Sequence, residues 1–210
     1  MGSAVTSTRP AATGPASAVD ASAFRQGMGS FATGVTVVTV ACDDGDMHGM
    51  TVNSFTSVSL DPMLVLVCLN ETSRGVSLIE RAGAFAVSVL SAGQRDLSRW
   101  FASRHRPAGP EMFDGALFEP GETGCPVLAD AAASFDCRLR QSHRAGDHLI
   151  VLGEVVALVH RSRLEPLIFH LSWSLLCNGV ILFDDTGELL PDGRAVPPHR
   201  LIHIRRPVAA

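Results

Sequence analysis

Apolar and β-branched runs dominate the patterned part of the chain and predict a mainly β protein with short helices. The run MLVLVCL is apolar on both faces, which predicts a strand in the interior of a sheet. The predicted strands occupy residues 35–40, 50–59, 63–69, 85–90, 133–143 and 147–160. Because most of these strands follow one another with few helices between them, we expect an antiparallel barrel.

Three segments have helical character. AFRQGMGSF, beginning at Ala23, predicts a short helix, and residues 76–82 predict a second helix that stops at Gly83. In SAGQRDLSRWFA, Ser91 and Gln94 have the spacing of a capping box. Leu97, Trp100 and Phe101 then share one face, so this helix is expected to pack on the core. Residues 103–125, rich in Gly, Pro and charge, predict a long loop.

The two ends of the chain differ from its middle. Residues 1–20 are nearly all Ala, Ser, Thr, Gly and Pro, which predicts a disordered leader. A single domain is expected over residues 21–176. Residues 177–210 form a C-terminal extension, in which DDTG predicts a hairpin turn and PPHRLIHIRR a solvated basic tail. The proline pair argues against a helical metal site at His199 and His203.

Composition and charge narrow the class of protein. With 46% hydrophobic and 18% charged residues among 210, the chain can bury a substantial core. Its net charge of −4 gives no basic surface for nucleic acid or an anionic membrane. Five scattered cysteines without a C-x-x-C pair favour neither a disulfide framework nor zinc. No apolar run suits export or membrane spanning, so the expected location is the cytoplasm.

Three polar stretches are candidate binding sites. GMTVNSFTSVSLDP (49–62) carries many short hydroxyl and amide groups, which suit the polar rim of a flat heterocycle such as an isoalloxazine. They equally suit the outer face of an ordinary strand. The loop NETSRG (70–75) has hydroxyls and a guanidinium beside a helix start, which suits a phosphate or a capped surface turn.

His148 begins a strand just after a turn, where its side chain could reach a ligand or serve only structure. Asp147 could be a turn residue, and Gly153 within the strand indicates a bulge or a close approach by another group. GMGSFA (27–32) fits G-x-G-x-x-A, but a helix precedes it and a strand follows. This order is the reverse of a Rossmann site, which we therefore exclude.

Several motifs, taken in order, resemble those of the flavin reductase family. They are FRQGMGSFATGVTVVT, GMTVNSFTSVSLDP, CLNETSRG, FAVSVLSAGQRDLSRWFA, GCPVLADAAASFDCRL and GDHLIVLGEV, and they cover about residues 24–170. The resemblance implies an FMN-binding split barrel, a homodimer, and reduction of FMN or FAD by NADH or NADPH. It further implies a flavin-dependent monooxygenase as the partner that receives reduced flavin.

The same resemblance assigns roles to particular residues. Residues implied to line the flavin ring and ribityl chain are Thr51, Val52, Asn53, Ser54 and Ser57. Residues implied to border the ribityl chain and phosphate are Cys68, Leu69, Ser73 and Arg74. His148 would contact the nicotinamide, and Phe169 joins the cofactor-binding set as an aromatic residue.

The chain departs from the family after Pro166, because no Arg occurs between Arg163 and Arg194. This altered region leaves a second hypothesis open, a split-barrel flavoenzyme that acts on an organic substrate in biosynthesis. The absence of a clear acid, base or nucleophile leaves a third, a non-catalytic flavin-binding subunit.

Overall fold

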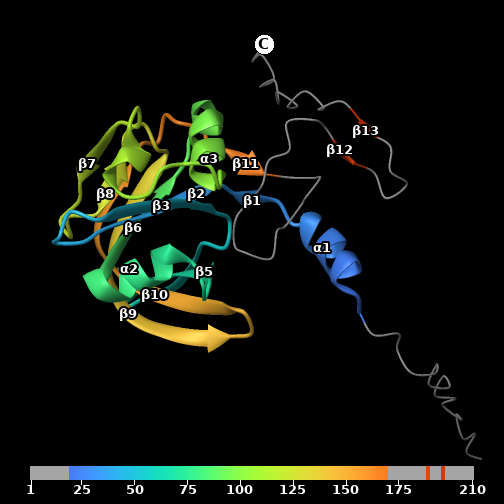
Figure 1. Cartoon of the computed structure of the whole chain (residues 1–210), viewed down its shortest axis with the longest axis horizontal. Helices are drawn as coiled ribbons and strands as arrows, with labels where there is room; N and C mark the ends of the chain where they lie inside the picture. Colours follow the sequence, from blue (N-terminus) through green and yellow to red (C-terminus); the bar gives the residue numbers. More distant parts are fainter. Residues whose placement is uncertain (1–18, 170–187, 190–194, 197–210) are drawn as a thin grey trace, which may run out of the picture.

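The computed structural model describes residues 19–169, together with the backbone of residues 188–189 and 195–196. Figure 1 shows a curled sheet flanked by short helices, with α1 standing to one side. The helices are α1 (Ala21–Gly29), α2 (Arg74–Ala82) and α3 (Arg95–Ala102), with the 3-10 turns η1 (Ala92–Gln94) and η2 (Pro110–Phe113). The strands are β1 (Thr33–Gly34), β2 (Thr36–Ala41), β3 (Met47–Val52), β4 (Thr56–Leu60), β5 (Met63–Asn70), β6 (Ala84–Val89), β7 (Phe118–Pro120), β8 (Pro126–Leu128), β9 (Ala133–Ala145), β10 (His148–His160), β11 (Ile168–Phe169), β12 (Glu188–Leu189) and β13 (Ala195–Val196).

The main sheet has seven antiparallel strands in the order β3-β2-β6-β9-β10-β5-β4. Its two edge strands, β3 and β4, are separated in sequence only by residues 53–55, so the sheet must curl to bring its edges together. At this corner Ser54 Oγ donates to the carbonyl of Cys68 at 2.8 Å and accepts from its N–H at 3.0 Å. The open, curled sheet confirms the predicted split barrel.

The single strand predicted over residues 50–59 is wrong, because the chain forms two strands there. β3 pairs with β2, whereas β4 pairs with β5 on the other edge of the sheet. The change of partner requires a break, which falls at residues 53–55. Sequence periodicity cannot reveal this break, because it reports burial and not the identity of the neighbouring strand.

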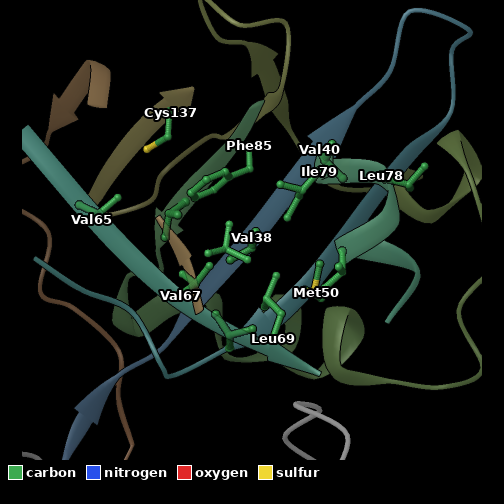
Figure 2. Close-up of a cluster of buried hydrophobic side chains, with 14 residues drawn as sticks. Val38, Val40, Met50, Val65, Val67, Leu69, Leu78, Ile79, Phe85 and Cys137 are labelled. Carbon is green, nitrogen blue, oxygen red and sulfur yellow. The ribbon is translucent and has the colours of Figure 1, made fainter. Parts of the chain in front are cut away.

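The core lies inside the curled sheet. Val38 of β2, Met50 of β3, Val67 of β5 and Phe85 of β6 belong to one buried cluster with Ile79 of α2 (Figure 2). β2 and β5 are far apart in the strand order, so only a strongly curved sheet can bring their side chains into one cluster. α2 therefore covers the interior of the barrel.

Gly153 shows both features expected of a glycine in a strand. The register between β9 and β10 shifts between Leu152 and Gly153, which marks a bulge or irregularity. A Cβ added at Gly153 would lie 2.5 Å from Cζ of Phe85 and 2.9 Å from Cβ of Cys137. The glycine is therefore needed because the Phe85 ring packs directly on the backbone of β10.

The predicted helices are confirmed in outline. α1 is capped by Asp20, whose Oδ1 accepts from the N–H of Ala23 at 2.8 Å, and α2 ends at Gly83 in the left-handed region. The Ser91 N–H donates to Gln94 Oε1 at 3.0 Å, as the capping-box spacing predicts. The helix α1 also precedes a strand, in keeping with the exclusion of a Rossmann site.

One detail of α3 differs from the prediction. Phe101 is fully buried, but Trp100 is 37% exposed and not on the core face. Its indole N–H donates to the carbonyl of Met112 at 2.7 Å, so it packs at the margin against η2. Leu97 is partly buried against the same cluster as Phe101, as predicted, and the small Ser98 and Ala102 are buried beside them. A small buried side chain gives no signal in a hydrophobicity pattern.

The remaining predictions concern the ends of the chain. Apart from residues 19–20, 188–189 and 195–196, the predicted leader and extension lie outside the described residues, as do DDTG, His199 and His203. In the part of the chain that is described, no helix is both long and apolar enough to cross a membrane.

Candidate functional site

Residues 50–54 and 68–75 lie alongside each other. Ser54 bonds to Cys68 at the barrel corner, and Ser73 Oγ lies 3.8 Å from Met50 Sδ. The Cα of Gly75 faces Met50 as well, because an added Cβ would overlap the Met50 side chain. The structure therefore brings together the two polar stretches that the sequence placed on separate elements.

Three of the predicted site residues have side chains committed elsewhere. Val52 and Leu69 are 2% and 1% exposed and belong to the barrel core. The hydroxyl of Thr51 donates to the carbonyl of Ser98 at 2.7 Å, beneath α3. A ligand at this site would therefore not contact the side chains of these three residues directly.

Every second residue of β3 directs its peptide groups away from β2, because β3 is an edge strand of the described sheet. The N–H of Gly49 donates to Met112 Sδ at 3.2 Å, and its carbonyl accepts from Arg106 Nη2 at 3.1 Å. These groups thus point away from β2, toward the open edge. Since the direction alternates along a strand, the peptide groups of Thr51 point to the same edge.

Asn53 connects the corner to a second small sheet. Its Nδ2 donates to Oγ1 of Thr33 at 3.5 Å, and Thr33 is the register partner of Phe169 in the β1–β11 pair. Phe169 therefore lies near the predicted ring-binding residues. Ser57 is exposed on β4, opposite Val65, so it lies farther along the barrel wall than Ser54.

The start of α2 is suited to an anion. Ser73 is its N-cap, and Ser73 Oγ accepts from the N–H of Gly75 at 3.3 Å. The preceding turn is closed by Asn70 Oδ1, which accepts from the N–H and the hydroxyl of Thr72 at 3.0 and 2.6 Å. A helix N-terminus carries partial positive charge, which Arg74 increases.

Arg74 is held by the β2–β3 hairpin. Its Nη2 donates to both carboxylate oxygens of Asp46, at 2.8 and 2.6 Å, and Arg81 also reaches Asp46. The hydrogen bond from Arg74 is the largest cause that lowers the pKa of Asp46. Only one nitrogen of the guanidinium makes these two contacts. Asp46 thus fixes Arg74 beside the helix start while partly offsetting its charge.

His48, which sequence reasoning missed, lies beneath the start of α2. It is 8% exposed, and burial lowers its pKa to about 4, with smaller contributions from the charges of Arg106 and Arg74. Among the described residues its Nδ1 has no hydrogen-bond partner. Its spacing in the sequence could have revealed it, because His48, Met50 and Val52 are two residues apart on one strand and therefore face the same interior.

His148 lies at the same end of the barrel as the 70–75 loop. It stands opposite Asn70 in the β5–β10 register, just after a turn with Gly146 at φ 66°. Its Nδ1 lies 2.7 Å from Asp147 Oδ1, and the N–H of Glu71 donates to the Asp147 carbonyl at 3.1 Å. His148, predicted to contact the nicotinamide, is thus on a loop that adjoins the one with Ser73 and Arg74, predicted to contact the phosphate.

The donor set fits a flavin. A flat ring with a polar rim needs peptide groups and short side chains, which the edge of β3 and residues 53–54 supply. The phosphate of such a cofactor needs a helix start and a cation, which Ser73 and Arg74 supply.

Residues 28–172 match the family described as flavin reductase like domain. The chain belongs to the flavin reductase family. Residues 169–201 match a second family, of unknown function (DUF5999), so the two matches meet near β11. The boundary predicted at residues 176–177 lies outside the described residues.

Several relatives are similar over most of this flavin reductase domain. A probable flavin reductase of Rhizobium meliloti (strain 1021) is 47% identical over 138 residues, 66% of this chain but only 43% of that protein. The monooxygenase reductase subunit HsaB of Rhodococcus jostii (strain RHA1) is 39% identical over 74% of this chain and 77% of its own length.

Solved structures agree with the sequence comparison. The NADH:FAD oxidoreductase SgcE6 of Streptomyces globisporus C-1027 superposes with a TM-score of 0.67 at 41% identity. The match covers 74% of this chain and 94% of SgcE6. This similarity extends the family relationship from the motifs to the arrangement of the strands.

Proposed function

We propose that this flavin reductase family member transfers a hydride from NADH or NADPH to FMN or FAD. One observation carries the proposal. Residues 51–54 lie beside residues 68–74 in space, and His148 lies on the adjoining loop. Bound flavin supplies the hydride acceptor, and the nicotinamide supplies the hydride. The protein must hold one ring still and orient the other against it.

Each predicted residue has a distinct task in this proposal. Thr51 offers peptide groups to the ring, whereas Val52 borders the ring with its own peptide groups turned toward β2. Asn53 and Ser57 offer side chains to the rim and the ribityl chain, and Ser54, whose hydroxyl donates to Cys68, offers an acceptor. Donors at the ring edge stabilise the negative charge that develops on reduction. No general acid is required for the transfer of the hydride.

The other residues hold the two ends of the reactants. Cys68 and Leu69 border the ribityl chain through the end of β5. Ser73 and Arg74 bind the phosphate, His148 contacts the nicotinamide, and Phe169 bounds the ring beyond Asn53. The placement of Thr33 between Asn53 and Phe169 supports this last assignment.

A homodimer is supported by the outer surface of β5 and β10. Leu66 pairs with Leu152 and Cys68 with Ile150, all on the face opposite the core and only half-buried. Apolar side chains on the outside of a sheet are typical of an interface, and a second copy of the chain is the occupant that we propose. Leu66→Glu should then yield monomers in sedimentation equilibrium, while a variant that stays dimeric would exclude this surface.

The partner that receives reduced flavin is, in this proposal, a separate flavin-dependent monooxygenase. The naming of HsaB as a reductase subunit supports it. The cytoplasm is the proposed location, because the four cysteines in the described part of the chain are free thiols.

Steady-state oxidation of NADH and NADPH, each with FMN and with FAD, tests the activity. We expect turnover with at least one pair and release of the flavin during gel filtration. Retention of flavin without oxidation of either nucleotide would favour the alternative flavoenzyme that acts on an organic substrate. Failure to bind any flavin would contradict the whole proposal.

A further inference from the structure

We propose that Asp147 is a positioning residue that fixes the imidazole tautomer of His148. In this arrangement Nδ1 of His148 carries its proton toward Asp147, and Nε2 is presented to the nicotinamide. The inference rests on the proposed function for the identity of the ligand. The placement of the proton itself depends only on contacts within the chain.

A hydrogen bond fixes the backbone of Asp147, and the His148 ring contacts its carboxylate. The Asp147 carbonyl accepts from the N–H of Glu71 at 3.1 Å, which ties the β9–β10 turn to the loop after β5. Its Oδ1 lies 2.7 Å from Nδ1 of the neighbouring His148. Asp147 thus contacts the phosphate-binding loop with its backbone and the nicotinamide residue with its side chain.

The ionised carboxylate determines which imidazole nitrogen is protonated. The hydrogen bond with His148 lowers the pKa of Asp147, so the group is ionised at neutral pH and can only accept. Nδ1 must therefore donate, and in the neutral ring Nε2 keeps its lone pair. A lone pair is suited to accept from the carboxamide N–H of a nicotinamide.

Two charged residues next to the Asp147–His148 pair, Glu71 and Arg144, contact each other. Glu71, on the turn beneath Asp147, pairs with Arg144 of β9 at 3.3 Å. Arg144 is the register partner of Leu149, the residue after His148. Because the charges of Glu71 and Arg144 offset each other, the carboxylate of Asp147 is the charged group that orients the His148 ring.

The competing explanation is that Asp147 only favours the turn. Gly146, with φ at 66°, already supplies the conformation that the turn requires. A turn residue would influence His148 through the backbone, and Asn would replace Asp with little loss. A positioning residue would lose its effect with Asn, because an amide can donate or accept and no longer selects one tautomer.

The first part of the test is a long-range ¹H–¹⁵N spectrum of the flavin-free protein, with His148→Gln used to assign the His148 signals. We expect protonated Nδ1 in the wild-type protein and a mixture of tautomers in Asp147→Asn. A wild-type ring with its proton on Nε2 would overturn the inference. This measurement does not depend on catalysis.

The second part is a double-mutant cycle on kcat/KM for NADH. Asp147→Asn should lower this value about tenfold, the loss of one charge-assisted hydrogen bond. It should cause no further loss in a His148→Gln background, because Asp147 acts only through His148. Flavin affinity should stay unchanged in all three variants, which excludes a general loss of structure.

Asp61→Asn is the matched control, because it removes a carboxylate from the exposed turn at the other end of β5 and should change nothing. Additive losses from Asp147→Asn and His148→Gln would overturn the inference. A His148→Gln variant with wild-type kcat/KM would instead contradict the proposed role of His148, and the spectrum would still decide where the proton lies.

Discussion

The barrel core and the edge are built from the same strands, where the edge consists of residues 51–54 and 68–74. They differ in how many of their side chains and peptide groups are used in contacts within the chain. In the core, the Phe85 ring packs so closely on β10 that position 153 has no room for a Cβ. At the edge, the peptide groups of β3 that face away from β2 pair with no strand of the described part of the chain. Alternate residues of one strand can therefore have different roles, some in the stability of the core and others in the binding of a ligand.

The largest effect should come from the core. Phe85→Ala should lower the free energy of unfolding by about 3–5 kcal/mol, since it leaves a cavity among buried side chains. The dissociation constant for FMN of the folded fraction should not change. Urea unfolding with a parallel flavin titration measures both, and Phe31→Ala, at a 66% exposed position, is the control. A Phe85→Ala variant that keeps its stability but loses flavin binding would contradict the separation of the core from the site.

His48 lies where the core meets the site, and its burial predicts how the free energy of unfolding depends on pH. Its pKa is about 4 in the folded chain against 6.5 when unfolded, so the unfolded chain takes up a proton first as the pH falls. Stability should therefore decrease as the pH falls from about 6.5 toward 4, by about 3 kcal/mol in total.

Urea unfolding at a series of pH values measures this dependence in the wild-type protein and in His48→Leu. The substitution removes the titrating group, so the two curves should diverge below about pH 6.5. Parallel curves would show that His48 does not titrate as its burial requires.

Arg74 tests the edge alone. Arg74→Gln should weaken FMN binding by about 1.5–3 kcal/mol, because a charge-assisted hydrogen bond to the phosphate is lost. Binding of riboflavin, which has no phosphate, should not change. Arg81→Gln removes another cation that contacts Asp46 and serves as the control. Equal losses for FMN and riboflavin would place the phosphate elsewhere.

Gly153 offers a smaller test of the core. Gly153→Ala should cost about 1–3 kcal/mol of stability, because the new methyl group overlaps the Phe85 ring. In a Phe85→Leu background the shorter side chain makes room, so the added cost should shrink. Thermal unfolding of the four proteins in this cycle measures the coupling, and strictly additive costs would exclude the contact.

The fold could be predicted to the extent that local patterns determine it. The β-branched runs, Gly83 and the Ser91–Gln94 spacing each correspond to an observed strand, helix end or cap. The break at residues 53–55 and the outward position of Trp100 could not be predicted. Both depend on which elements pack together, which a single sequence does not reveal.

The candidate site was predictable in its polar residues but not in its buried ones. Ser54, Ser73 and Arg74 stand out as short or charged groups beside apolar runs. The use of Thr51 for a contact with Ser98, the pairing of Arg74 with Asp46 and the burial of His48 arise from tertiary contacts. Sequence spacing alone contains no information on them.

The crystal structure of this chain with FMN tests the central claim most directly. We predict the isoalloxazine ring against the peptide groups of residues 51–54, with the phosphate at Ser73 and the start of α2. One face of the ring should be open toward His148. A flavin bound away from both segments, or a ring with both faces covered by the protein, would contradict the account.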